Sequence, residues 1–78
     1  MAELKDILAD IARAIVEEPN EVSVEQEDSG SEIVLTLHVA PDDMGKVIGR
    51  HGKIARSIRM LMKAAASTAD AKVRVDIR

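Results

Sequence analysis

The chain has 78 residues and a formal net charge of −3; 46% of its residues are hydrophobic, yet none is Phe, Tyr, Trp or Cys. This length fits a single domain spanning residues 1–78, whose core must be built from aliphatic side chains. The lack of Cys excludes a disulfide framework and a thiolate nucleophile, and no apolar run reaches the roughly 18 residues of a membrane span. We therefore expect a cytoplasmic protein that does not enter a membrane.

The N-terminal half of the chain predicts one helix and two strands. Apolar residues first recur at helical spacing, at Leu4, Ile7, Leu8, Ile11 and Ile15. Pro19-Asn20 ends this helix, and residues 21–27 then alternate between apolar and polar side chains. Asp28-Ser29-Gly30-Ser31 reads as a hairpin loop, after which residues 33–39 resume the alternation. We expect two antiparallel strands that each turn one face towards the core.

The C-terminal half predicts two helices joined by a glycine turn, followed by a last strand. Pro41 stops the second strand, and Asp42 is expected to cap a short helix that runs to Val47 or Ile48. A longer helix is expected from Gly52 to near Ala69, and residues 72–78 alternate as a third strand. The inward stripe of the long helix is expected to comprise Ile54, Ala55, Ile58, Leu61, Met62, Ala65 and Ala69.

This order of elements restricts the topology. A strand, two helices and a strand form a right-handed crossover, which places the second and third strands parallel. The hairpin pairs the first and second strands antiparallel. We therefore predict an α+β domain of order α-β-β-α-α-β, with a three-stranded mixed sheet and all three helices on one face.

Charges are strongly segregated along the chain. Residues 44–69 contain no acid and six basic residues: Lys46, Arg50, Lys53, Arg56, Arg59 and Lys63. The rest of the chain holds five basic residues against all fourteen acids. On a helical wheel, Arg56, Arg59 and Lys63 fall opposite the predicted apolar stripe. A local basic surface of this kind attracts phosphate even when the whole protein is acidic, because surface electrostatics are screened over short distances.

The glycine turn, Gly49-Arg50-His51-Gly52, combines several features that suit a phosphate. Glycine allows a tight turn and close approach, while the following helix offers free N–H groups at the positive end of its dipole. A nucleotide P-loop is excluded, because its first glycine would fall on Val47 and Ile54 replaces the metal-binding hydroxyl. A dinucleotide fingerprint lacks its third glycine. An ordinary helix–turn–helix corner and a GxxG clamp on a nucleic-acid backbone remain.

Residues 47–58 resemble the core motif of a KH domain, and the order of elements resembles the type II arrangement. With residues 39–46 and 59–66, the likeness extends over essentially the whole chain to the small bacterial single-KH-domain proteins of the KhpA (YlqC-type) family. This resemblance implies binding of single-stranded RNA and a role as a post-transcriptional regulator or RNA chaperone linked to cell shape or division. It also implies a heteromer with a larger KH-containing RNA-binding protein (KhpB/Jag-like); a homodimer is also possible.

The resemblance places the RNA site at the glycine turn and in an adjacent apolar groove for about four nucleotides. Ile48, Ile54 and Ile58 would wall this groove, with Val73 and Val75 behind. Ala55 stands where many KH domains have a bulky aliphatic residue, which predicts a wider groove. The expected RNA-binding residues are Lys46, Ile48, Gly49, Arg50, His51, Gly52, Lys53, Ile54 and Arg56.

The sequence offers no pattern of catalytic or metal-binding residues. His38 and His51 are its only histidines, and neither has a Cys or paired carboxylate at ligand spacing. We therefore expect no enzyme activity, no metal and no cofactor. Without aromatic stacking platforms, RNA binding should be weak, which favours dimerisation or a second RNA-binding module. Met60 and Ala64, on the outward side of the long helix, are candidates for such an interface.

Two other classes of function stay open at this point. A binder of duplex DNA would share the helical corner, but the second helix begins with Lys53, Ile54 and Ala55, which offer few base-reading groups. A protein–protein adaptor with only incidental RNA contact is the stronger alternative. It would display an exposed apolar patch away from the glycine turn.

Overall fold

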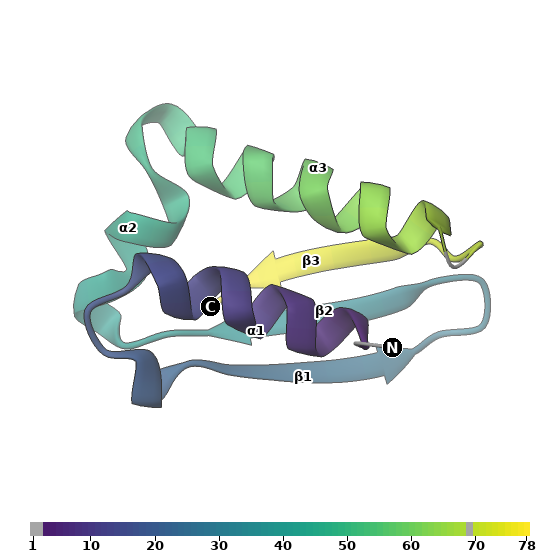
Figure 1. The fold of residues 1–78 in the computed structure, drawn as a ribbon, viewed down its shortest axis with the longest axis horizontal. Helices are drawn as coiled ribbons and strands as arrows, with labels where there is room; N and C mark the ends of the chain where they lie inside the picture. Colours follow the sequence, from purple (N-terminus) through teal and green to yellow (C-terminus); the bar gives the residue numbers. More distant parts are fainter. Residues whose placement is uncertain (1–2, 69) are drawn as a thin grey trace.

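The computed structural model describes residues 3–68 and 70–78. A three-stranded sheet forms one layer and the helices form the other (Figure 1). The α-helices and strands follow the predicted order and are α1 (Leu4–Ile15), β1 (Ser23–Asp28), β2 (Ile33–His38), α2 (Met44–Ile48), α3 (Lys53–Thr68) and β3 (Val73–Ile77). Short 3₁₀ turns precede β1, α2 and α3 and are η1 (Pro19–Glu21), η2 (Pro41–Asp43) and η3 (Arg50–Gly52). The predicted α+β class and element order are confirmed.

The strands lie in the order β1-β2-β3. β1 pairs antiparallel with β2, with Ser23 opposite His38, while β2 pairs parallel with β3, with Leu35 beside Val75. β3 is therefore an outer strand, and α3 runs alongside it (Figure 1). Both predicted pairings are confirmed. A hairpin makes its two strands antiparallel, and a right-handed crossover makes the strands that it joins parallel.

The core lies between the helices and the inner face of the sheet. Leu8 of α1, Leu35 and Leu37 of β2, and Ile58 and Met62 of α3 are all at most 2% exposed. These side chains are aliphatic or thioether groups, so the core is filled by branched residues and one flexible methionine. No helix within residues 3–68 and 70–78 has both the length and the apolar character needed to cross a bilayer.

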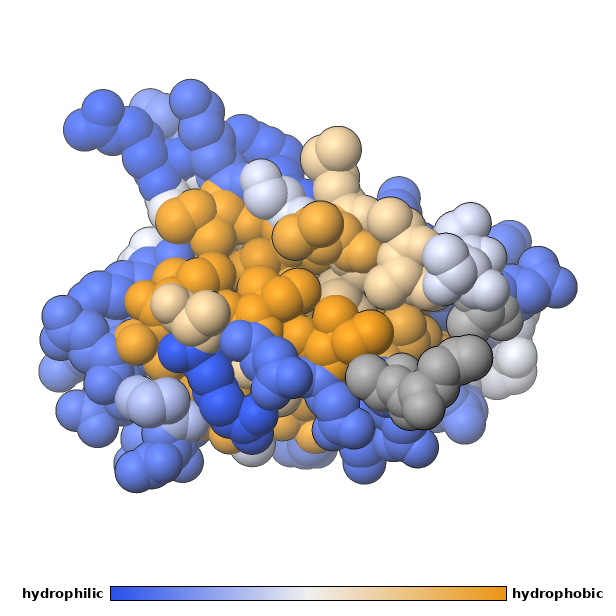
Figure 2. Space-filling view, viewed as in Figure 1, coloured by the Kyte–Doolittle hydropathy of each residue, from blue (hydrophilic) through white to orange (hydrophobic). Residues whose placement is uncertain are grey.

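The buried face of α3 is narrower than predicted. Its buried residues are Ala55, Ile58, Met62 and Ala66, whereas Ile54 is 36% exposed and Leu61 is 56% exposed. Ile54 and Leu61 were therefore wrongly assigned to the core, and the predicted Ala69 lies outside the described residues. The physical reason is that the sheet covers only one side of α3, so the flank next to α1 remains partly open to solvent (Figure 2).

The expected role of Asp42 is also corrected. The helix α2 starts at Met44, and Asp43 occupies the N-cap position with only 2% of its surface exposed. The Asp43 carboxylate accepts hydrogen bonds from the backbone N–H groups of Glu17 (3.2 Å) and Glu18 (3.0 Å). It thereby joins the segment after α1 to the start of α2, across 25 residues of sequence.

Candidate nucleic-acid interface

The loop between α2 and α3 has a backbone that depends on glycine. Gly49 has φ 75° and ψ 174°, a region that is essentially restricted to glycine. His51 (φ 57°) and Gly52 (φ 74°) also have positive φ values, so three of the four residues 49–52 are left-handed. The N–H of Gly52 donates to the carbonyl of Gly49 at 3.1 Å, and the N–H of Lys53 donates to the carbonyl of Arg50. The loop is consequently tight and well defined.

Two N–H groups at the tip of this loop are free to bind a ligand. Among the described residues, the backbone N–H groups of Arg50 and His51 donate to no protein acceptor. Both residues are exposed, as is Lys53 at the start of α3. Free backbone donors at the beginning of a helix, surrounded by basic side chains, form a suitable environment for an oxyanion.

Ile54 packs directly against the backbone of the loop. A Cβ placed on Gly49 would lie only 2.6 Å from Cγ1 of Ile54, so any side chain at position 49 would overlap it. This contact turns Ile54 away from the core and leaves it part-exposed, like Ile48, which is 38% exposed. Ile48 and Ile54 therefore provide the apolar surface next to the loop.

Two predicted features of the groove were wrong. Ile58 is 2% exposed and Ala55 is 5% exposed, so both face the core. Ile58 cannot wall a groove that is open to RNA, and the small size of Ala55 does not widen one. Both assignments came from the resemblance to KH domains, whereas helical spacing had placed Ala55 and Ile58 on the inward stripe of the long helix, where the structure has them.

The basic residues around the loop have different roles. Arg56 donates from Nη1 to the carbonyl of His51 at 2.8 Å, which holds the left-handed residue in place. Within the described part of the chain, Arg50 and Lys53 make no ion pair. Lys46 instead pairs with Glu17 at 3.0 Å and lies 4.0 Å from Asp43. Among Arg50, Lys53, Arg56 and Lys46, therefore, only Lys46 has its positive charge offset by described acidic side chains, those of Glu17 and Asp43.

A groove follows the outer edge of β3 beneath α3. Arg59 of α3 donates from Nε to the carbonyl of Val75 at 3.1 Å. The groove at this point has a volume of about 100 Å³ and is lined by Arg59, Lys63, Val73, Arg74 and Val75. Arg59 and Lys63 were not among the expected RNA-binding residues. The signal that pointed to them was the acid-free basic run in residues 44–69.

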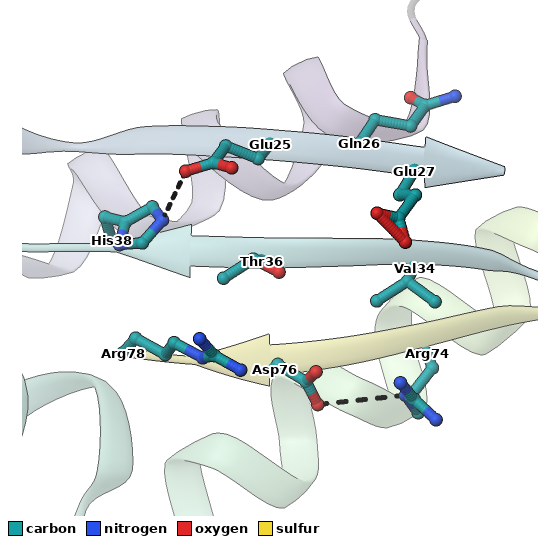
Figure 3. Close-up of a pocket in the computed structure, with 9 residues that line it drawn as sticks. All are labelled: Glu25, Gln26, Glu27, Val34, Thr36, His38, Arg74, Asp76 and Arg78. Atoms are coloured by element: carbon teal, nitrogen blue, oxygen red, sulfur yellow. Dashed lines mark hydrogen bonds and ion pairs between the residues drawn. The ribbon is translucent and has the colours of Figure 1, made fainter.

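The opposite face of the sheet is a poorer site for phosphate. It carries a shallow depression of about 380 Å³ in which acidic and basic side chains face one another (Figure 3). Glu25 lies 2.8 Å from His38, and Arg74 lies 3.9 Å from Asp76. Because Arg74 lies beside Asp76 and the carboxylates of Glu25 and Glu27 also line this depression, a polyanion would gain less there than at the loop.

The comparisons with known proteins agree with this geometry. Residues 5–77 match the family model described as KhpA/KhpB, KH domain. The chain is 46% identical to RNA-binding protein KhpA of Clostridium acetobutylicum, over 95% of this chain and 99% of that protein. It is 42% identical to RNA-binding protein KhpA of Halalkalibacterium halodurans and 41% identical to that of Treponema pallidum, over 95% and 94% of this chain and 97% and 91% of those proteins.

These relatives are named for binding and not for a reaction, which agrees with the expectation that the chain is not an enzyme. The family model matches residues 5–77, which include every strand of the sheet and the GxxG loop between α2 and α3. The chain therefore belongs to the KhpA/KhpB KH-domain family.

Proposed function

We propose that this protein binds single-stranded RNA in the cytoplasm, with residues 1–78 acting as one KH domain. The RNA backbone would lie against the loop at residues 49–52, and the bases would enter the groove between α3 and β3. The free N–H groups of Arg50 and His51, next to cations that have no described acidic partner, are the observation that carries this proposal. The names of the relatives support RNA as the ligand.

Different residues in and around the loop would make different contacts with the RNA. Gly49 and Gly52 allow a phosphate to approach the backbone, while Arg50, His51 and Lys53 donate hydrogen bonds or supply charge. Ile48 and Ile54 offer apolar contact to unstacked bases, and Arg56 keeps the loop in its binding conformation. Lys46 contributes to the local positive potential, since direct contact with RNA would require it to leave Glu17.

The double substitution Arg50→Asp with His51→Asp tests this proposal. Asp tolerates a left-handed conformation, so the loop should still form with both glycines in place. Two carboxylates would then face the phosphate, each repulsion costing on the order of 1 kcal/mol. RNA affinity should fall at least about tenfold in fluorescence anisotropy, while circular dichroism stays unchanged. If the folded variant binds single-stranded RNA like the wild type, the adaptor function replaces RNA binding.

A second proposal concerns assembly and rests on an exposed apolar surface of the helical layer. Figure 2 shows this surface between α1 and α3. Met60 is 70% exposed and Leu61 is 56% exposed, and α1 adds the half-buried side chains of Leu4, Ile7, Ile11 and Ile15. A surface of this kind suits a homodimer or a heteromer with a larger KH-containing protein (KhpB/Jag-like). Through such complexes the protein would act on RNA fate and, as a consequence, on cell shape or division.

Met60→Asp tests the assembly. A carboxylate in an apolar interface should weaken association, so the mass measured by analytical ultracentrifugation, alone or with the partner, should fall. Asn20→Asp provides a matched control, because it adds the same charge at an exposed site in η1. Equal masses for Met60→Asp and Asn20→Asp at all concentrations would remove this surface from the interface.

A further inference from the structure

The outer edge of β1 carries a row of backbone groups that do not pair within the sheet. The N–H of Ile33 and the C=O of Leu37 in β2 form hydrogen bonds of 2.8 Å with residues 72 and 78, on the side of β3. Backbone groups alternate in direction along a strand, so the even-numbered residues of β2 face β1, where they lie opposite residues 23, 25 and 27. Val24, Gln26 and Asp28 consequently direct their N–H and C=O groups out of the sheet.

This edge is open to the addition of another strand. β1 is an outer strand, and no helix of the described residues lies beyond it (Figure 1). Its register with β2 runs from Ser23 to Asp28 without a bulge, and the strand contains neither Pro nor Lys, which are common means of protecting an exposed edge. An extended segment could therefore pair with β1 through its backbone, as in β-augmentation.

The side chains around the edge are acidic. Residues 14–37 contain seven acids and no Lys, Arg or His. Glu25 and Glu27 project from β1 on the outer face of the sheet (Figure 3). Among the described residues, Glu25 pairs only with His38, while Glu27 and Asp28 form no ion pair. An added β1 strand from a second copy would place like charges opposite one another, and RNA would be repelled.

We propose that the β1 edge binds an extended basic segment of a protein partner, in which Lys or Arg alternates with apolar residues. The basic side chains would lie on the outer face of the sheet beside Glu25 and Glu27, and the apolar ones on the helical side beside Val24, which packs against the core. Backbone hydrogen bonds would supply affinity, and the alternating side chains would supply specificity. Because β1 and β3 form opposite margins of the sheet, this site is separate from the proposed RNA-binding groove.

The first experiment titrates the isotope-labelled full chain with a synthetic octapeptide of alternating lysine and valine, at one fixed salt concentration. The amide signals of Val24, Gln26 and Asp28 should shift, and their exchange with solvent should become slower. The same peptide with N-methylated valines keeps every charge but cannot pair as a strand. It should bind at least about tenfold more weakly, and an octapeptide of alternating glutamate and valine should bind more weakly still.

Gln26→Pro removes an outward N–H without breaking the pairing with β2, which is where an edge strand tolerates proline. The variant should keep its circular dichroism spectrum and its affinity for single-stranded RNA, but should bind the lysine–valine peptide at least about tenfold more weakly. Gln26→Thr, which keeps the N–H, is the matched control and should bind within about twofold of wild type. Glu25→Gln with Glu27→Gln leaves the backbone intact and should weaken peptide binding about threefold or more.

Strand addition is overturned if the lysine–valine peptide does not bind, or if its N-methylated form binds equally well. Equal affinities of folded Gln26→Pro and Gln26→Thr would overturn it too; if Gln26→Pro does not fold, the two peptides and the double glutamine variant decide. An unchanged affinity in that double variant would refute selection of a basic segment. Shifts of the same amide signals with protein concentration alone would assign the edge to a second copy instead.

Discussion

The conformation of Gly49 predicts that alanine at this position destabilises the fold, and Gly45 in the neighbouring helix provides a matched comparison. Gly49→Ala should strongly destabilise the fold, whereas Gly45→Ala, within α2, should stabilise it. Gly49 has φ 75° and ψ 174°, and a Cβ there would lie 2.6 Å from Cγ1 of Ile54. A Cβ on Gly45 would meet no described atom within 4 Å, and its φ is not positive.

The size of each effect follows from this geometry. Placing a side chain in the backbone region of Gly49 costs about 1–3 kcal/mol, and the overlap with Ile54 raises the total to about 2–4 kcal/mol. For a domain of this size, each kcal/mol lowers the Tm by about 4–8 °C, so a loss of about 8–32 °C is expected. Gly45→Ala should gain about 0.5–1 kcal/mol, because alanine loses less backbone entropy in a helix.

Thermal unfolding followed by circular dichroism measures both variants directly. Gly52→Ala should fall between them: its φ is 74°, but a Cβ there would lie 3.5 Å from Nη1 of Arg56, which is an ordinary contact. The expected order of Tm is Gly45→Ala, wild type, Gly52→Ala and Gly49→Ala. If Gly49→Ala melts within a few degrees of Gly45→Ala, the loop does not hold the strained conformation described above.

Two further predictions concern the anchoring of α2 and the nature of the RNA contact. Asp43→Ala leaves the N–H groups of Glu17 and Glu18 without their acceptor, so the free energy of unfolding measured in urea should fall by about 2–4 kcal/mol. A decrease below about 1 kcal/mol would mean that water replaces the carboxylate at little cost. The affinity for single-stranded RNA should fall as the salt concentration rises. For contacts to two to four phosphates, a plot of log K against log salt concentration should have a slope of about −1.5 to −3. An affinity that does not change with salt would argue against phosphate contact.

The sequence predicted the features that depend on local periodicity. Alternation of apolar and polar residues in 33–39 located β2 and its buried Leu35 and Leu37. The GxxG motif located the loop between α2 and α3, because glycine readily adopts the positive φ values that Gly49 and Gly52 have in this turn. The topology then followed from connection lengths and handedness.

The features that the sequence could not predict depend on contacts between distant segments. Asp43 accepts hydrogen bonds from the backbone N–H groups of Glu17 and Glu18, which lie 26 and 25 positions earlier in the chain. Sequence spacing alone therefore could not distinguish the role of Asp43 from that of Asp42. Ile54 and Leu61 fit an apolar stripe on a wheel, but the rotation of α3 over the sheet leaves them exposed. The contact between Arg59 and Val75 likewise requires β3 to lie beside α3.

The two flanks of α3 explain how a net-acidic protein could bind both RNA and a protein partner. Arg59 and Lys63 lie on the flank that faces the outer edge of β3, whereas Leu61 and Met60 lie on the exposed side of the same helix. In the proposed complexes, RNA and partner would therefore not compete for the same side chains. An RNA that reached two grooves of one assembly would gain affinity through effective concentration, without any additional contact. This gain would offset the weak binding expected of a single groove without aromatic residues.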